Sequence, residues 1–185
     1  MIENETFEKV DFKEMELDEE YMDCVFVACD FSGKEIRNTD FDQCEFRTCN
    51  FTMTRFREAL RDVAFVDCKM TGADFTDLNR FSGDLVFEHS HLDYASFMEA
   101  KLRKTVFRGC NMREGYFDCA DMADSVFDRC DLDRVSFAGA NLERADFSTS
   151  FNFVINPTVC KLNKAIFSQY GLKGLVAHLN IEIRE

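Results

Sequence analysis

The residues of this chain that could perform chemistry are nine cysteines, three histidines and a large excess of carboxylates. His89 and His91 flank Ser90, so in an extended segment both imidazoles point to one side and could contact one metal ion. No third ligand stands nearby. Cys119 could be an exposed nucleophile, but no residue at a fixed spacing supplies a base to activate it. The sequence also lacks a glycine-rich phosphate loop, a nucleophile elbow and paired-cysteine zinc spacing. We therefore predict a non-enzymatic protein that uses no cofactor and no metal.

A repeat of five residues decides how all of these side chains are placed. Every fifth residue from Phe87 to Phe147 is Phe, Leu or Met, and a second series from Phe26 to Phe56 keeps the same step. This period matches neither the 3.6 residues of a helix turn nor the alternation of a single strand, so it is read as an internal repeat. The first series is Phe87, Leu92, Phe97, Leu102, Phe107, Met112, Phe117, Met122, Phe127, Leu132, Phe137, Leu142 and Phe147.

Small residues stand two positions before most of the large ones. They are Cys24, Cys29, Cys44, Cys49, Cys68, Cys110, Cys130 and Cys160, with Ala73, Ala95, Ala100, Ala120, Ala140 and Ala145 in equivalent places. A large and a small inward side chain in each repeat fit a narrow, densely packed tube. We interpret these cysteines as small core residues that stay reduced in a cytoplasm, although pairs such as Cys110 and Cys130 on adjacent coils could reach one another.

Phe alternates with Leu or Met in the long series, which predicts four repeats per turn, with Phe on two opposite walls. Residues twenty apart should then lie in columns, and their charges alternate in sign, as neighbouring strands require. These columns are Glu88–Arg108–Asp128, Asp93–Arg113–Asp133, Lys104–Asp124–Arg144, Lys101–Asp121 and Glu114–Arg134. The sequence therefore predicts an all-β, four-sided solenoid.

We expect one domain: an N-terminal cap over 1–21, a solenoid over 22–167 and a C-terminal element over 168–185. Phe7, Phe12 and Leu17 also step by five, so the cap is read as a degenerate first coil, with a short acidic helix over Met15–Asp23 as the alternative. The step lengthens twice, which predicts bulged coils at 57–64 and 76–86. The C-terminal element shows helical spacing and could cap the monomer or join two copies. We favour a homodimer, with its contacts at Leu172, Leu175, Val176 and Leu179.

The formal net charge of −13 argues against nucleic acid as a direct ligand, because phosphate binding needs clustered Lys and Arg. The charge is uneven: residues 1–24 hold ten acids against two lysines. No apolar run is long enough for a membrane helix, and the acidic start is unlike a signal peptide. We expect a cytoplasmic protein that binds no membrane and uses its surface for binding.

The repeats themselves resemble those of the pentapeptide-repeat family, written A(D/N)LXX. The segments that carry the resemblance are CDFSG (29–33), CEFRT (44–48), CNFTM (49–53), ADFTD (73–77), CNMRE (110–114), CDLDR (130–134), ANLER (140–144) and ADFST (145–149). The resemblance covers most of 22–167 and implies a right-handed quadrilateral β-helix.

The tail INPTVCKLNKAIFSQYGLKGLVAHLNIEI and the opening VFVACDFSGKEI are similar to the Qnr-type quinolone-resistance group, in its Gram-positive version. That resemblance implies an end-to-end dimer that mimics B-DNA, binds DNA gyrase and topoisomerase IV, and relieves quinolone inhibition. The Gram-negative members carry two long loops, whereas the irregular segments here are short. Acids outside the neutralised columns and residues of the second irregular segment are the expected partner contacts: Asp67, Asp74, Asp77, Arg80, Phe81, Asp84, Asp118 and Glu143. The alternatives are an immunity protein of the same fold that guards gyrase against a peptide toxin, and a scaffold with an unrelated partner.

Overall fold

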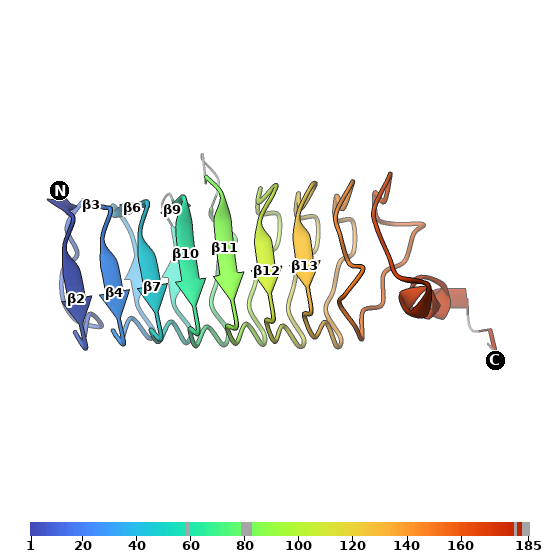
Figure 1. Ribbon diagram of the computed structural model, residues 1–185, viewed down its shortest axis with the longest axis horizontal. Helices are drawn as coiled ribbons and strands as arrows, with labels where there is room; N and C mark the ends of the chain where they lie inside the picture. Colours follow the sequence, from blue (N-terminus) through green and yellow to red (C-terminus); the bar gives the residue numbers. More distant parts are fainter. Residues whose placement is uncertain (58–59, 79–82, 180, 183–185) are drawn as a thin grey trace.

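The computed structural model describes residues 1–57, 60–78, 83–179 and 181–182. The chain winds into a rod of stacked coils that runs from the N-terminus at one end to a short helix at the other (Figure 1). Neighbouring strands are parallel throughout. The fold is the predicted right-handed quadrilateral β-helix, a solenoid closed by one short C-terminal helical element.

The strands are short because each covers only one wall of a coil. They are β1 (Ile2–Glu3), β2 (Thr6–Glu8), β3 (Glu20–Met22), β4 (Val25–Val27), β5 (Glu35–Ile36), β6 (Asp40–Asp42), β7 (Glu45–Arg47), β8 (Arg55–Phe56), β9 (Leu60–Arg61), β10 (Val63–Val66), β11 (Leu85–Glu88), β12 (Val106–Arg108) and β13 (Val126–Asp128). They form sheets in the order β1-β3-β6-β9, β13-β12-β11-β10-β7-β4-β2 and β5-β8. The helical elements are η1 (Gln169–Gly171), α1 (Lys173–Val176) and η2 (Ala177–Leu179).

Each wall is named here by its central inward residues. The sheet wall carries the seven-stranded sheet and centres on Phe26, Phe46, Phe65, Phe87, Phe107 and Phe127. The Leu92 wall, the Phe97 wall and the Leu102 wall follow in chain order. Isolated bridges continue them, for example His91 to Asn111, Ser96 to Tyr116 and Lys101 to Asp121. Residues one turn apart therefore pair directly, as the columns predicted.

The interior is a stack of aromatic rings, with Phe on two opposite walls from Phe87 to Phe147 as predicted, while in the first coils rings such as Phe31 and Phe51 also stack on the other walls. On the sheet wall the centroids of Phe87 and Phe107 lie 5.0 Å apart in parallel planes, and on the Phe97 wall those of Phe97 and Phe117 lie 4.7 Å apart. Rings of the two walls meet edge-on, as Phe97 and Phe107 do at 5.8 Å. Full burial of each Phe contributes about 1.5–3 kcal/mol of transfer free energy, and edge contacts of this geometry add further stabilisation.

Two kinds of corner join the walls, and they differ in one backbone hydrogen bond. In the first kind the amide three residues after the central residue donates to its carbonyl, as Ala95 N does to Leu92 O at 3.0 Å. After the sheet-wall strands β10 and β13, a side chain of the next coil supplies these contacts instead. Ser90 Oγ accepts from Cys68 N at 3.0 Å and lies 3.3 Å from Phe65 O. Ser150 Oγ accepts from Cys130 N at 3.0 Å and donates to Phe127 O at 2.6 Å.

This second kind of corner gives the cysteines a more specific role than the predicted one of small core residues. The thiols of Cys49, Cys68 and Cys110 each donate to the carbonyl of a sheet-wall Phe in the coil before, at 3.3–3.4 Å. Cys49 Sγ also accepts from Cys29 N at 3.4 Å. This column therefore consists of Cys and Ser because both can donate and accept, whereas the alanine side chain can do neither.

The irregular segments are explained by the strand register. Phe46 pairs with Phe65, 19 residues later, and Phe41 pairs with Leu60, also 19 later, so the first segment is one residue short. The bulge predicted at 57–64 was wrong: the coil contracts, and Leu60 takes the inward place. Phe65 pairs with Phe87, 22 residues later, so the second coil carries two extra residues. Asp62 Oδ1 accepts from Asp84 N at 2.9 Å where that coil rejoins the sheet wall.

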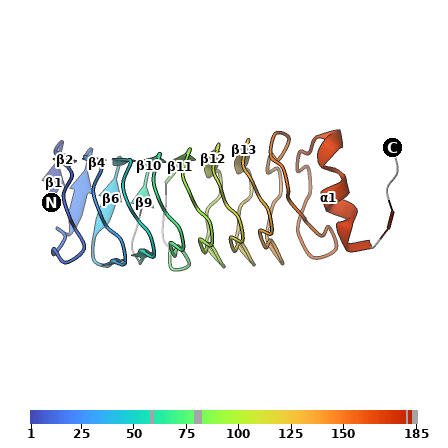
Figure 2. The same cartoon turned by 90° about the horizontal axis from the view of Figure 1, so that it is seen from below.

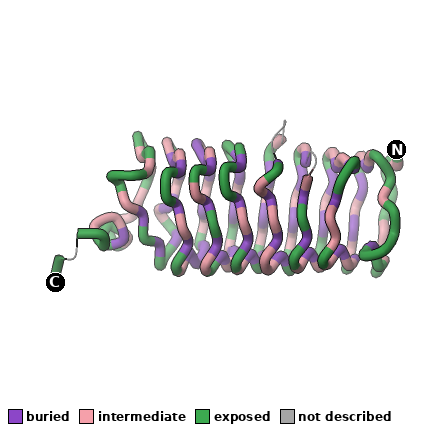
Figure 3. The backbone as a smooth tube through the Cα atoms, turned by 180° about the vertical axis from the view of Figure 1, so that it is seen from behind, coloured by how far each residue is buried: buried purple, intermediate pink, exposed green. Residues whose placement is uncertain are grey.

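The residues before β3 form the first coil, because β1 pairs with β3 and β2 pairs with β4, one turn later in each case. Tyr21 is the inward residue that the fivefold step missed, since it follows Leu17 by four residues and stacks on Phe41 at 5.3 Å. The alternative of a helix over Met15–Asp23 is wrong; β3 lies within this segment. Figure 3 shows inward residues as buried along the rod and the first coil as mainly exposed.

Candidate functional site

The residues singled out for chemistry are dispersed over the surface and the core in the part of the chain that is described. His89 and His91 both point outward and are exposed, as predicted. They border a hollow of about 180 Å³ together with Asn111, Arg129 and Asp131. Among the described residues, no group of three or more His, Cys, Asp and Glu side chains could hold a metal ion.

The nine cysteines are all free, and seven of them are buried. Burial raises the pKa of the Cys44 thiol to about 11. A hydrogen bond with Cys49, together with burial, also raises the pKa of Cys68. Such thiols are poor nucleophiles because the thiolate is the reactive form. Cys119 is exposed, as the sequence suggested, and Cys160 is half-buried.

The outer surface carries several of the predicted charge pairs, while other charges of the columns take different partners, such as Asp128, which pairs with Arg129 at 3.3 Å. Arg108 reaches Glu88 at 2.5 Å, Arg144 reaches Asp124 at 2.5 Å and Arg134 reaches Glu114 at 3.5 Å. The Arg113 guanidinium, however, pairs with Asp131 at 2.8 Å, and Asp93 Oδ1 accepts from the Arg113 backbone N at 3.1 Å. Arg103, and not Lys104, is the second partner of Asp124. The hydrogen bonds from Arg144 and Arg103 lower the pKa of Asp124 to about 2, against the effect of burial.

The predicted partner contacts lie on several walls. Asp74 and Asp118 share the Phe97 wall, because Asp74 pairs with Ser96 and Ser96 pairs with Tyr116, one residue before Phe117. Asp77 lies beyond the next corner and pairs with Arg57. Asp67 and Asp84 are exposed near the sheet wall, and Glu143 follows Leu142 on the Leu102 wall. Arg80 and Phe81 lie outside the described residues.

Asp74, Asp77 and Asp118 are therefore the predicted residues that one partner could contact together. Asp74 Oδ1 accepts from Thr76 N at 3.0 Å and from Thr76 Oγ1 at 2.6 Å. Asp118 Oδ1 accepts from Ser136 Oγ at 2.6 Å. These hydrogen bonds hold both carboxylates against a rigid wall, which fixes the positions of their charges.

Sequence reasoning missed that the same wall is largely uncharged between Phe97 and Phe137. Its outward residues there are Ser96, Met98, Tyr116, Asp118, Ser136 and Ala138, with Met98 and Tyr116 exposed. The signal was present in the sequence, because these residues stand directly before and after Phe97, Phe117 and Phe137. A largely uncharged strip with exposed Met and Tyr side chains beside fixed carboxylates is typical of a surface that binds protein.

The C-terminal element lies across the last coil (Figure 2). Ile155 N donates to Gly174 O at 3.1 Å, Gly174 is buried and Leu175 packs partly on the core. Both Gly171 and Gly174 lie so close to Phe153 that a Cβ at either position would overlap it. The element therefore covers the apolar end of the solenoid, as capping requires.

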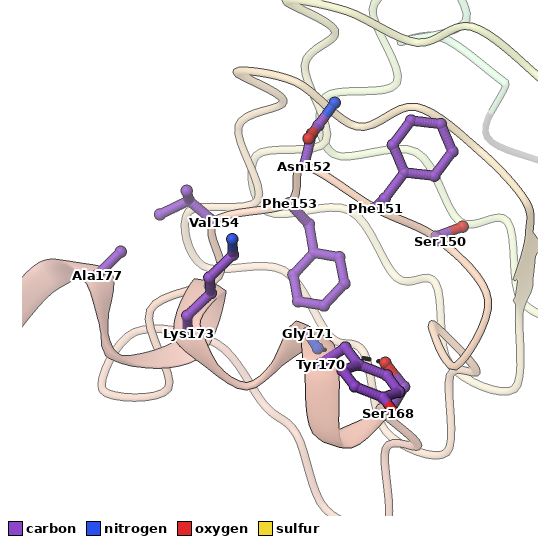
Figure 4. A pocket seen from close by; sticks show the side chains of 11 residues that line it. Ser150, Phe151, Asn152, Phe153, Val154, Ser168, Tyr170, Gly171, Lys173 and Ala177 are labelled. Carbon is purple, nitrogen blue, oxygen red and sulfur yellow. Dashed lines mark hydrogen bonds between the residues drawn. The ribbon is translucent and has the colours of Figure 1, made fainter. Parts of the chain in front are cut away.

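The cap still leaves apolar groups uncovered. Of the predicted dimer contacts, Leu172 and Leu179 are exposed at 50% and 53%, while Leu175 and Val176 are half-buried. A separate hollow of about 480 Å³ lies between residues 150–154 and the helical element (Figure 4). Phe151, Phe153 and Tyr170 give it apolar walls, and none of the predicted dimer contacts lines it.

Within the described residues, no helix combines the length and the apolar character needed to cross a membrane. No curated protein sequence matches the chain significantly. Among solved structures, full-length QnrB1, described as a plasmid-mediated fluoroquinolone resistance protein, is 20% identical over 97% of this chain and 99% of that one, with a TM-score of 0.43. HetL, a pentapeptide repeat protein involved in heterocyst differentiation regulation in the cyanobacterium Nostoc sp. strain PCC 7120, is 14% identical over 90% and 86%, with a TM-score of 0.34.

Two family models match the chain itself. One, described as pentapeptide repeat region, matches residues 19–97. The other, described as pentapeptide repeats (8 copies), matches 84–118 and 120–148. Together the two models cover residues 19–118 and 120–148, which form stacked coils of the solenoid described above. The chain belongs to the pentapeptide-repeat protein family.

Proposed function

We propose that this protein is a non-catalytic DNA mimic of the cytoplasm that binds DNA gyrase and topoisomerase IV and protects them from quinolones. The observation that carries the proposal is a rigid rod with a formal net charge of −13, joined coil to coil by backbone hydrogen bonds and ring stacks. A rod of this kind presents negative charge at fixed positions along its axis, which is what a basic DNA-binding surface recognises.

Long-range attraction between such a rod and a basic surface speeds association and weakens as salt screens it. The ion-paired carboxylates of the columns, such as Glu88, Glu114 and Asp124, contribute little to this field, because each lies beside an arginine. Asp74 and Asp118, held on the Phe97 wall, contribute more. The uncharged strip between them supplies the apolar contact that charge steering alone does not.

The same proposal includes a homodimer that doubles the rod through its C-terminal end. Leu172 and Leu179 are large exposed apolar residues on the element that covers the last coil, and a twofold contact would bury them. Replacing both by glutamate should give monomers by light scattering. Met53→Glu is the matched control, because Met53 is exposed at 62% on a corner of the solenoid, far along the chain from the cap. A dimer that survives the double replacement would contradict this contact.

The deciding assay is gyrase supercoiling and quinolone-induced cleavage, titrated with the protein at two salt concentrations. Restored supercoiling and reduced cleavage at low salt, with a weaker effect at high salt, are expected. The triple variant Asp74→Asn, Asp77→Asn, Asp118→Asn should lose the effect. A control triple, Asp67→Asn, Asp84→Asn, Glu143→Gln, removes the same number of charges from other parts of the surface and should retain most of it. Equal loss in both triples would leave net charge alone as the cause.

The uncharged strip on the Phe97 wall also favours a second candidate, a scaffold whose protein partner is not a topoisomerase. Met98 and Tyr116 are exposed there and offer apolar contact area to a protein partner. Under this alternative, neither topoisomerase forms a complex at any salt concentration. An immunity role against a peptide toxin would instead show gyrase binding and protection from the toxin, but not from a quinolone.

A further inference from the structure

The two ends of the rod differ. The helical element covers the C-terminal end, whereas β1 and β2 of the first coil are edge strands, each paired on one side only. Figure 2 shows this coil at the end of the stack with no further segment across it. Among the described residues, no segment pairs with the outer side of β1 or β2. An edge strand offers unpaired backbone groups to another extended chain.

The backbone groups available at this edge can be named. Val25 N donates to Glu5 O at 2.9 Å, and Lys9 N donates to Val27 O at 2.8 Å, so Glu5 and Lys9 face β4. In a parallel ladder, alternate residues turn their N–H and C=O groups to opposite sides. Thr6 and Glu8 therefore direct their N–H and C=O groups away from β4, in the geometry of a strand that awaits a partner.

The aromatic stack also stops at this edge. Phe7 stacks on Phe26 with centroids 4.9 Å apart, and the next ring of the column would lie on its other face. Phe7 is only half-buried, and so are Ile2, Val10 and Leu17 around it. An incoming strand that carries an aromatic or aliphatic residue would extend the stack by one level and cover the outer face of Phe7.

The charges at this end select the partner. Glu3, Glu5, Glu8, Glu14 and Glu16 are exposed, and within residues 1–24 no ion pair engages them. Lys13 is already held by Asp11 at 3.2 Å and by Asp30 at 3.4 Å. A second copy of this end would bring like charges together, which opposes pairing between copies. A segment rich in Lys or Arg would be attracted.

From these observations we propose that the N-terminal edge binds an extended basic segment of a partner protein, which adds as a strand beneath β2. Its backbone pairs with Thr6 and Glu8, an apolar residue stacks on Phe7, and flanking Lys or Arg residues contact the exposed glutamates. This site lies at the opposite end of the rod from the cap and does not depend on topoisomerase binding.

The probe is a synthetic peptide in which the Val-Phe-Val sequence of β4 is flanked by lysines, acetylated and amidated at its ends. Binding to the full chain is expected by calorimetry, with new protection of the Thr6 and Glu8 amides in hydrogen exchange. Raising the salt concentration should weaken it. The same peptide with glutamate in place of lysine should not bind.

Thr6→Pro removes one outward donor, and proline is tolerated where an edge N–H faces solvent. This variant should bind the peptide about 3- to 10-fold more weakly, the loss expected for one neutral hydrogen bond. Thr6→Val keeps the donor and should bind like the native chain. If Thr6→Pro does not fold, the double variant Glu5→Gln, Glu8→Gln tests the contact between the glutamates and the peptide lysines. It should bind the lysine peptide more weakly than the native chain does. Equal binding of the lysine and glutamate peptides, or protection that omits Thr6 and Glu8, would overturn the proposal.

Discussion

Replacing Ser90 by alanine should destabilise the solenoid far more than the loss of one hydroxyl in a core normally does. Ser90 is buried, and its Oγ accepts from Cys68 N at 3.0 Å. The same atom lies 2.9 Å from Glu88 O and 3.3 Å from Phe65 O, so it also has an acceptor for its proton. Alanine would leave the Cys68 N–H without this acceptor in a dry interior, and almost no cavity would form.

An orphaned buried donor costs about 1–3 kcal/mol. For a chain of this length, that corresponds to a fall in Tm of about 2–12 °C. Ser125→Ala is the matched control, because Ser125 is equally buried and donates to Leu102 O at 3.2 Å, but no backbone N–H is seen to donate to its Oγ. It should cost about 1 kcal/mol or less. Ser90→Cys should recover most of the lost stability, since Cys49 occupies the equivalent place two coils earlier.

The assay is urea unfolding of the three variants, followed by far-ultraviolet circular dichroism, with midpoints compared at equal slope. The reasoning predicts an order: native and Ser90→Cys close together, Ser125→Ala slightly below, and Ser90→Ala lowest. If Ser90→Ala is as stable as Ser125→Ala, the Cys68 N–H does not need the Ser90 hydroxyl of the next coil as its acceptor. If Ser90→Cys fails to recover stability, the shared role of Cys and Ser in this column is refuted.

Three further results are expected. The Asp124 carboxylate contributes stability that is fully present above its unfolded pKa of about 3.9 and is lost as the pH falls toward its folded value of about 2; Arg144→Gln should raise that pKa in an NMR titration. A thiol reagent should modify Cys119 first in the folded chain, because it is the one cysteine classed as exposed, and fast reaction at several cysteines would contradict the buried column. Gly174→Ala should loosen the cap by about 1–3 kcal/mol, because its Cβ would overlap the Phe153 carbonyl; faster proteolysis of the C-terminal element measures this, and native resistance would refute it.

The sequence alone was sufficient for the architecture because each coil repeats one local rule. A large residue every five positions and a small one two before it leave few ways to fill a narrow tube. The same rule predicted opposite Phe walls and charge columns such as Glu88 beside Arg108. It failed where the step changed, since a pattern search cannot tell a shortened coil from an interruption. Tyr21 and Leu60 were therefore missed as inward residues, although both keep the stack continuous.

The candidate binding surface was only partly predictable. The spacing alone showed which acids lie outside the charge columns. The wall on which each of these acids lies could not be predicted, because it depends on the number of residues in each irregular coil. The coil before Phe87 holds two extra residues, so Asp74 pairs with Ser96 and not with a residue twenty positions later. This pairing is what places Asp74 on the same wall as Asp118. The arginine partners also escaped prediction, because a long side chain can choose among several carboxylates once the coils are stacked.

The sequence by itself determined the inward ladder, the four walls and the excess of acid, because each follows from residue type and period. Only the tertiary structure decided which hydrogen bonds close the corners, since the partner of Cys68 N is a side chain from the following coil. It also decided that the helical element covers one end of the described rod and that β1 and β2 are edge strands at the other. An edge exists only when strands are stacked, so no local pattern could reveal that Thr6 and Glu8 face outward.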